Sequence, residues 1–599
     1  MQVRVEVSQP LESGAELVAV GRFEEEDVPY GLASEPGGAE SRGGEGKWTL
    51  IHPRDAWRES SADGGVDGGG VGSGGVGSGG VDGGDAGGGG VNDGGAGGGG
   101  VDGGDAGGAP GGGGAGGARR VLVVGLGKRE ELDGERLRVA ASVAAEQARR
   151  LRLPTIAWDL TCLTDPATSH GESPRSGSSG AEVLDATATA TAAALIDGTA
   201  LTDWRFDRFK SKSGSTGTGA DSAGADAAED ETGPVITSLT LVTAPGGHDA
   251  DDESLAELRR AAEFERVAVA AQNRARDLQS LPGNHLTPAA LAERAAQVAA
   301  SFDTVTDETL GPDRIAQLEM GGLLAVSRGS EHGPHLIVLR YNGADAHASG
   351  SGAGGAPVLG LVGKSVTFDT GGISLKPPAS MPDMKMDMSG GAAVLEAVAA
   401  IAELGLPLNL VAVLPAVENM PSGTAIKPGD IITQYSGKTV EVNNTDAEGR
   451  LILADALAYC IEAGAGRVVD LATLTGAVLI ALGSTYSGLI ANDDELAASV
   501  ANAGDAAGEP AWRLPLHREY RELTRGKMAD LSNAGTDRKA GTIYAGAFLE
   551  QFVGDTPWAH LDIAGTAWDT SRRYFAKGPT GVGTRLLINL ARAQAAIGA

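Results

Sequence analysis

A long glycine-rich tract divides the chain and limits what can fold on either side of it. From about residue 63 to 117 the sequence repeats every five residues, with one valine or alanine between glycine, serine, asparagine and aspartate. One small apolar side chain in five buries too little surface to offset the entropy lost on ordering so much glycine. We therefore expect a disordered insert at 63–117. Further low-complexity stretches lie at about 171–180 and 211–233.

The segments between these stretches alternate between strand and helix patterns, which is typical of α/β folds. In the first half, the patterns predict strands at 3–7, 16–20, 121–124, 155–160 and 235–242 and a helix at 134–152. In the second half, they predict helices at 289–301, 389–404 and 451–463 and strands at 335–341, 358–362 and 408–414. We predict two α/β domains, a smaller one over 1–250 and a larger one over 282–599 with a central mixed sheet flanked by helices. A helix over 251–281 connects them.

Composition excludes several classes of function. The chain has 48 Lys and Arg against 79 Asp and Glu, a net charge of −31, so a nucleic-acid partner is not expected. Two cysteines, Cys162 and Cys460, cannot form a disulfide framework, and no secretory signal is recognised at the N-terminus, so we expect a cytoplasmic protein. The longest uncharged stretch, Leu471–Asn492, contains many Thr, Ser and Gly residues, which favours a buried helix and strand over a membrane span.

Two motifs that suggest other chemistry can be set aside. Gly363-Lys364-Ser365 resembles the end of a phosphate-binding loop, but Val358 stands where the full pattern needs glycine. The chain then continues in an extended pattern instead of a helix, so we do not expect nucleotide binding there. Cys460 lies on a predicted helix and is expected to be a core residue, not a nucleophile.

Three short segments concentrate charge in apolar or glycine-rich surroundings: 362–376, 384–391 and 443–451. Asp446 and Glu448 are two residues apart, so in an extended segment both carboxylates would point to the same side. A single Asp-x-Glu near a strand end is more often a turn or a cap than a metal ligand. Four carboxylates near strand ends of an α/β domain, however, could form a cluster that binds hard metal ions. These four are Asp369, Asp387, Asp446 and Glu448.

The same segments resemble the leucine aminopeptidase (cytosol aminopeptidase) family of dinuclear metallopeptidases. The octapeptide 444–451, Asn-Thr-Asp-Ala-Glu-Gly-Arg-Leu, is similar to the signature of that family without a change. The resemblance is dense from about Phe264 onwards and makes 282–599 the catalytic metallopeptidase domain. The glycine-rich inserts and Ser365, where glycine is usual, depart from the family pattern. Further matching segments are 205–210, 282–288, 368–376, 387–390, 418–423, 470–476 and 558–565.

The resemblance implies a role for each matched residue. It makes Lys376 and Arg450 the catalytic pair and implies two divalent ions per subunit, Mn²⁺ or Zn²⁺, with bicarbonate held at Arg450. Four carboxylates and two divalent ions form a neutral cluster only if Lys364 is an uncharged amine, which adjacent dications favour. The implied metal ligands are Lys364, Asp369, Asp387, Asp446 and Glu448, and the implied substrate-binding residues are Met384, Thr473, Leu474 and Gly476.

The implied activity is hydrolysis of the N-terminal residue from peptides, with leucine and other apolar residues preferred. The expected partners are peptides with free N-termini and further copies of the chain, because the family assembles as a homohexamer. Two alternatives stay open: a dinuclear hydrolase that acts on a non-peptide bond, such as a phosphatase, and a non-catalytic scaffold that retains the fold. Histidine is missing from the cluster, which disfavours the first, and Lys376 and Arg450 are retained, which disfavours the second.

Overall fold

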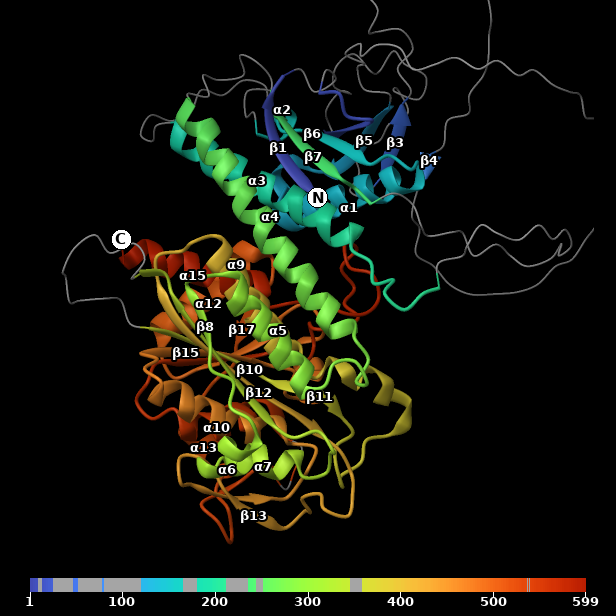
Figure 1. Cartoon of the computed structure of the whole chain (residues 1–599). Coiled ribbons are helices and arrows are strands. Elements are labelled where there is room, and N and C mark those ends of the chain that lie inside the picture. Colours follow the sequence, from blue (N-terminus) through green and yellow to red (C-terminus); the bar gives the residue numbers. More distant parts are fainter. Residues whose placement is uncertain are drawn as a thin grey trace, which may run out of the picture. The chain divides into compact units, whose positions relative to one another are not determined.

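A computed structural model of the chain describes residues 1–8, 13–24, 47–51, 78–79, 120–164, 180–211, 235–243, 252–344, 358–535, 537 and 539–598. These residues form two compact units, and each is described separately below. The N-terminal unit comprises Met1–Gly198 and Asp226–Ala262, and the C-terminal unit comprises Thr199–Ala225 and Glu263–Ala599. Both units combine sheets with helices (Figure 1), so the predicted α/β class is confirmed.

Nearly all of the predicted insert at 63–117 lies outside the described residues, as do most of 171–180 and 211–233. One short piece of the insert is described. Ser78–Gly79 form strand β4, which pairs antiparallel with Trp48 and Thr49. Backbone pairing of this kind does not require a large side chain. Apart from this short strand, the disordered insert stays a prediction.

The N-terminal unit contains a seven-stranded sheet in the order β1-β7-β6-β2-β5-β3-β4. Its first five strands are parallel, and β3 and β4 add antiparallel to one edge. The strands are β1 (Gln2–Val7), β2 (Leu17–Phe23), β3 (Trp48–Ile51), β4, β5 (Arg120–Gly127), β6 (Thr155–Asp159) and β7 (Ser238–Thr243). Helices α1 (Gly134–Arg150), α2 (Thr161–Thr164) and α3 (Gly180–Asp203) accompany them. The strands predicted in this half correspond to β1, β2, β5, β6 and β7.

The C-terminal unit is built on a nine-stranded mixed sheet in the order β17-β16-β19-β15-β10-β12-β9-β8, with β11 paired to β12. Its strands are β8 (Val305–Asp307), β9 (His335–Asn342), β10 (Leu359–Gly363), β11 (Ser365–Asp369), β12 (Asn409–Asn419), β15 (Arg467–Ala472), β16 (Ser487–Ala491), β17 (Ala511–Arg513) and β19 (Trp558–Asp562). A smaller sheet contains β13 (Asp430–Thr433), β14 (Thr439–Val442) and β18 (Leu531–Ser532). The predicted central mixed sheet is confirmed.

The longer helices of this unit are α4 (Asp252–Ser280, which begins in the N-terminal unit), α5 (Pro288–Ser301), α9 (Ser389–Glu403), α10 (Gly449–Glu462), α12 (Asp494–Ala507), α14 (Gly541–Leu549) and α15 (Thr584–Gly598). The shorter ones are α6 (Pro312–Gln317), α7 (Gly321–Ser327), α11 (Gly476–Leu482) and α13 (Arg518–Leu523), with 3-10 helices η5 (Pro378–Met386) and η6 (Glu550–Phe552). No helix in the described part of the chain is both long and apolar enough to cross a membrane.

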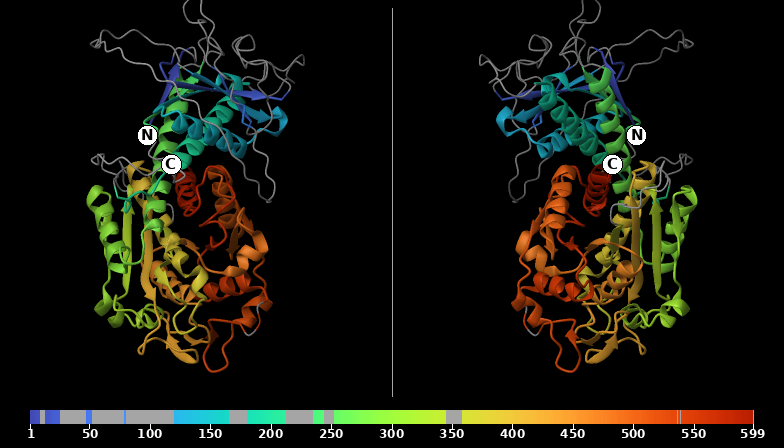
Figure 2. Two further views of the ribbon diagram at one scale, coloured as in Figure 1. Left: turned by 90° about the vertical axis from the view of Figure 1, so that its right-hand side faces the viewer. Right: turned by 90° about the vertical axis from the view of Figure 1, so that its left-hand side faces the viewer.

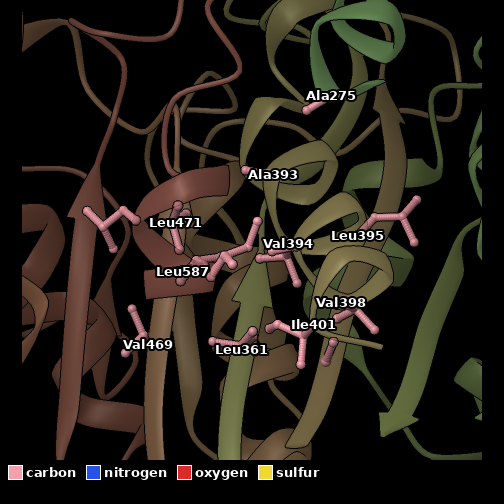
Figure 3. Close-up of a cluster of buried hydrophobic side chains, with 14 of the residues drawn as sticks. Ala275, Leu361, Ala393, Val394, Leu395, Val398, Ile401, Val469, Leu471 and Leu587 are labelled. Carbon is pink, nitrogen blue, oxygen red and sulfur yellow. The ribbon is translucent and has the colours of Figure 1, made fainter. Parts of the chain in front are cut away.

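Helices cover both faces of the large sheet, so its central strands are buried on both sides (Figures 1 and 2). Successive side chains of a strand point to opposite faces. Leu361 of β10 therefore packs with α9 and α15, while its neighbour Val362 packs with α7 and α10. In Figure 3, Val394, Val398 and Ile401 of α9 lie beside Leu361 and Val469. This two-sided packing requires nearly continuous apolar strands, which the predicted runs at 358–362 and 408–414 supplied.

The apolar stretch Leu471–Asn492 does not match its prediction throughout. Strand β16 is fully buried as expected, but the prediction of a buried helix is wrong. In α11 only Val478 is buried, packed over Gly488 of β16, and Ile480 is 91% exposed. An apolar run without clear periodicity does not reveal which side of a short helix the fold covers. Cys460, by contrast, is buried in the core as predicted.

A buried carboxylate, Asp455, fixes the position of α10. Its Oδ2 accepts hydrogen bonds from the backbone N–H groups of Gly322 (2.8 Å) and Leu323 (3.1 Å), and its Oδ1 accepts one from that of Tyr435 (2.7 Å). These bonds tie the middle of α10 to the start of α7 and to the turn after β13. The first turn of α10 follows directly from Glu448, so Asp455 also fixes the helix that carries part of the site described next.

We expect Asp455→Ala to lower the free energy of unfolding by about 2–4 kcal/mol, because two buried N–H donors and one partly buried donor lose their acceptor. Asp455→Asn retains one oxygen and should cost less. Urea unfolding followed by circular dichroism measures the change. Asp505→Ala, which removes an exposed aspartate from α12, is the matched control. A midpoint for Asp455→Ala equal to that of the control would contradict the anchoring role.

Candidate metal centre

The charged residues predicted from the sequence meet at one edge of the large sheet. Strands β10, β12, β15 and β19 run parallel, so their carboxyl ends share this edge, where α/β folds place their sites. Lys364 follows β10, Asp369 ends β11, and Asp387 lies between η5 and α9. Asp446 and Glu448 lie in the connection from β14 to α10. We call Asp369, Asp387, Asp446 and Glu448 the acidic cluster.

The connection that carries Asp446 and Glu448 is a turn, not the extended segment that the sequence analysis assumed. Ala447 donates its N–H to the carbonyl of Asn444 (3.3 Å), and Glu448 has the helical backbone conformation of the residue that starts α10. The two side chains still converge, because the turn and the helix start bring them together. The predicted extended segment is therefore wrong, although Asp446 and Glu448 do lie close together.

Lys364 closes the buried end of the acidic cluster. Its Nζ lies 2.7 Å from Asp387 Oδ2 and 2.8 Å from Glu448 Oε1, and it donates a hydrogen bond to the carbonyl of Thr473 (2.9 Å). The Lys364 side chain is only 3% exposed. Thr473 also donates its hydroxyl to Asp387 Oδ1 (2.8 Å). Backbone and side chain of Thr473 therefore hold the lysine and one carboxylate together.

Lys376 occupies the open end. Its Nζ lies 2.8 Å from Asp369 Oδ2 and also contacts Asp446 Oδ1. The side chains of Lys376 and Asp446 are 19% and 31% exposed, whereas that of Asp369 is 3% exposed. A molecule from solvent therefore reaches the acidic cluster from the side of Lys376 and Asp446.

The two lysines do not balance the four carboxylates, and the pKa values respond to the surplus. Burial raises the pKa of Asp387 well above its usual range, and repulsion from Asp369 and Glu448 adds to the shift. Burial and the same kind of repulsion raise the pKa of Asp369, and they raise the pKa of Asp446 to about 6. Burial alone would raise the pKa of Glu448 too, but Lys364 and Lys376 lower it overall.

In this arrangement Lys364 is a charged ammonium. Burial disfavours its charge, but the carboxylates of Asp387, Glu448 and Asp369 outweigh that effect and raise its pKa. The sequence analysis expected Lys364 to be a neutral amine. That expectation concerns a site with bound metal ions, whose positive charge would take the place of the proton on Lys364.

The acidic cluster fits divalent metal ions. Asp369, Asp446 and Glu448 each place a carboxylate oxygen within 4.8 Å of the others. Glu448 Oε2 is buried and accepts no hydrogen bond in the described part of the chain, which is costly unless a cation binds there. Carboxylate oxygens together with one amine nitrogen suit Mn²⁺ or Zn²⁺.

Arg450 lies in the first turn of α10, two residues after Glu448. Its Nη1 donates a hydrogen bond to the carbonyl of Asn533 (2.7 Å), and its buried Nε has no hydrogen-bond partner within the described residues. Burial lowers the pKa of the guanidinium. Among the described residues no carboxylate lies at ion-pair distance from Arg450, so its unused donor is available to an anion.

Of the four residues expected at the substrate, only Thr473 contacts the acidic cluster directly within the described part of the chain. Met384 is half-buried in η5, three residues before Asp387. Leu474 donates its N–H to Asp562 Oδ1 (3.2 Å), so its carbonyl is the backbone group left for a substrate. Gly476 begins α11, and a β-carbon there would meet nothing within 4 Å.

Three supporting residues were not assigned a role from the sequence. Asn419, at the end of β12, donates to Asp369 Oδ1 (2.8 Å). Asn533 donates to the carbonyl of Asn444 (2.7 Å) and so fixes the turn that carries Asp446. Asp562, at the end of β19, accepts a hydrogen bond from the hydroxyl of Thr475 (2.5 Å). Asn419 and Asp562 lie in the matching segments 418–423 and 558–565, so the family resemblance could have identified them. Asn533 lies in none of the matching segments, and a lone asparagine is typical of any turn.

Gly449 leaves the space that Lys364 fills. A β-carbon at position 449 would lie 2.6 Å from Cε and 2.8 Å from Nζ of Lys364. The lysine cannot move aside easily, because Asp387, Glu448 and Thr473 hold its end.

We expect Gly449→Ala to weaken Mn²⁺ binding at least tenfold, because a displaced neighbour of a ligand typically costs 10- to 100-fold in metal affinity. Alanine favours a helix more than glycine does, so the fold should persist. Isothermal titration with MnCl2 measures the affinity. Gly311→Ala, at a position with open space around it, is the control, and equal affinities of the two variants would refute the packing argument.

Comparison with known proteins tests the family resemblance. Two family models match the chain: the catalytic domain of the cytosol aminopeptidase family matches residues 273–588, and the N-terminal domain of the same family matches residues 111–173. A probable cytosol aminopeptidase of Roseiflexus castenholzii (strain DSM 13941 / HLO8) is 45% identical over 477 residues, which are 79% of this chain and 87% of that protein. One from Acidovorax sp. (strain JS42) is 50% identical over 323 residues, 54% of this chain and 62% of that protein.

A solved structure agrees with these matches. The bottromycin maturation enzyme BotP in complex with Mn has a TM-score of 0.69 and 29% sequence identity, and the match covers 97% of this chain and all of that chain. The resemblance read from the motifs is therefore confirmed by sequence over most of the chain and by fold. The chain belongs to the cytosol aminopeptidase family.

Proposed function

We propose that this chain is an aminopeptidase that uses two divalent metal ions to hydrolyse the N-terminal residue from peptides, with leucine and other apolar residues preferred. The observation that carries the proposal is the acidic cluster, a partly buried surplus of carboxylates with Lys376 at its open end. Membership of the cytosol aminopeptidase family supports the peptidase activity.

Lys364, Asp369, Asp387, Asp446 and Glu448 would hold the ions, and Asp369 and Glu448 are the residues that we expect to serve both. Bound ions would supply a water of lowered pKa and polarisation of the carbonyl group. Lys364 can act as a ligand only after it loses its proton, so binding should release protons. Mn²⁺ and Zn²⁺ both suit the donor set, and the solved structure of BotP contains Mn.

Lys376 is the group that we assign to the reacting carbonyl. As a charged ammonium at the open end, it can donate a hydrogen bond to the carbonyl oxygen as negative charge develops there. Its contacts with Asp369 and Asp446 fix the direction of its Nζ before the substrate arrives. This orientation avoids reorganisation at the moment of reaction.

Arg450 is the second catalytic residue in the proposal. Its unpartnered Nε donor supports the binding of a small anion beside Glu448. Bicarbonate held there would supply a general base for the proton that moves to the leaving amine.

Met384 and Thr473 would contact the side chain of the N-terminal residue, and the backbone of Leu474 and Gly476 would contact the peptide. A half-buried methionine adapts to apolar side chains of different shapes. We further propose a cytoplasmic homohexamer, with its location supported by the names of the relatives.

The test is amide hydrolysis by the purified full chain before and after treatment with a chelator. We expect the chelated protein to lose activity and to regain it with Mn²⁺ or Zn²⁺. On the reloaded protein, leucine amide should be cleaved faster than lysine amide, and N-acetyl-leucine amide should not be cleaved, because its acylated nitrogen cannot ligate a metal ion. Full activity without metal would refute the two-metal proposal. A preference for lysine amide would refute the proposed preference for apolar N-terminal residues.

Lys376→Ala separates binding of the metal from catalysis. We expect kcat to fall about 10²- to 10³-fold, the typical cost of losing one donor to the developing charge, with metal content unchanged. Metal analysis and activity are measured on the same sample. Lys527→Ala, on an exposed lysine, is the control. A loss of metal in proportion to the loss of activity would show that Lys376 acts on the ions instead.

A further inference from the structure

A second charged site lies in the C-terminal unit, in a cavity of about 480 Å³. The segment after α3 contributes Arg205 and Arg208, α4 contributes Arg274, and α5 contributes Arg294. We call these four residues the arginine pocket. Glu396 of α9 also lines the cavity. It lies seven residues after Ser389, which starts α9 beside the acidic cluster, so the two positions are roughly 10 Å apart along the helix. The pocket shares no lining residue with the metal centre.

Glu396 holds two of the arginines in fixed positions. Its fully buried carboxylate accepts a hydrogen bond from Arg274 Nε (2.7 Å) and two from Arg294, from Nε (2.8 Å) and Nη2 (2.9 Å). The side chains of Arg274 and Arg294 remain 34% and 28% exposed. One buried acid therefore orients the guanidinium groups of two arginines that line the cavity.

Many donors of the arginine pocket are unused. Within the described residues, the terminal nitrogens of Arg274 and Nη1 of Arg294 have no hydrogen-bond or ion-pair partner. The same holds for the whole guanidinium groups of Arg205 and Arg208. Unused guanidinium donors on several sides of one cavity suit an anion with several oxygens.

The charge around the cavity is positive, although the chain carries a net charge of −31. The lining holds four arginines against Asp207, Asp277 and Glu396, so its cations exceed its carboxylates by one. Lys210 lies outside the lining, 3.6 Å from Asp207, and offsets the charge of that carboxylate. Asp277 is also engaged, since it accepts a hydrogen bond from Trp204 Nε1 (2.9 Å).

We propose that the arginine pocket binds a small phosphorylated molecule through its phosphoryl group. A phosphoryl group carries up to two negative charges at neutral pH and three acceptor oxygens, which suit a positively charged lining with unused donors from several directions. A carboxylate has two oxygens and is satisfied by a single arginine fork. Phe206, Leu278 and Leu281 line the cavity as well, so the rest of the ligand meets an apolar wall.

The test uses phenyl phosphate and sulfate as probes, titrated into the full chain by calorimetry at constant ionic strength. We expect one saturable site per chain, with phenyl phosphate bound more tightly than sulfate because its ring reaches the apolar wall. The double variant Arg205→Gln, Arg208→Gln should lower the affinity for phenyl phosphate at least tenfold. Both residues lack hydrogen bonds within the described residues, so the fold should persist, and circular dichroism checks this.

Arg518→Gln, on an exposed arginine of α13, is the matched control and should leave the affinity unchanged. Unchanged affinity in the double variant would place the bound phosphate elsewhere, for example at the metal centre, and would overturn the proposal. So would the absence of saturable binding to the wild-type chain. Aminopeptidase activity of the double variant is measured in parallel, and neither of these outcomes depends on it.

Discussion

The burial of more carboxylates than cations at one edge of a sheet is the constraint on which the rest of this structure depends. Isolated buried charges are costly, and a buried acid normally pairs or becomes protonated. Here Lys364 and Lys376 pair with four acids, and burial, together with repulsion between the carboxylates, raises the pKa of three of them. A divalent ion relieves this repulsion directly, which explains why Glu448 Oε2 can lie buried without a hydrogen-bond donor. The same repulsion between carboxylates would therefore favour the binding of divalent ions.

The fold maintains this strain because the cluster rests on rigid elements. The parallel strands β10, β15 and β19 are buried on both faces and deliver Lys364, Thr473 and Asp562 to the same edge. Asp455 fixes α10 from its middle, so that Glu448 and Arg450 at its start cannot drift. Asn419 and Asn533 hold one carboxylate and one turn by neutral hydrogen bonds. Neutral donors orient the acids without adding charge, so they leave the attraction for metal intact.

Patterns with a clear physical period predicted the fold well. Apolar runs such as Val121–Val124 and Val358–Val362 became central strands, since only a strand buried on both faces tolerates such a run. The acidic cluster was recognisable because three segments concentrate charge in apolar or glycine-rich surroundings and together resemble one family. The exposure of α11 and the turn at Asp446 were not predictable, because both depend on which distant elements pack nearby. The arginine pocket was equally hidden, since its four members come from three separate parts of the chain.

Lys364 joins two buried acids of the site. Its Nζ lies 2.7 Å from Asp387 and 2.8 Å from Glu448 and holds these carboxylates at a fixed spacing. Beside bound cations it would be a neutral amine that could serve as a ligand. A methionine or leucine at position 364 could not perform the first task, and an arginine, whose charge persists at any ordinary pH, could not perform the second. Position 449 must be glycine for the same reason, because a β-carbon there would occupy the space of the Lys364 side chain and keep it from reaching both acids.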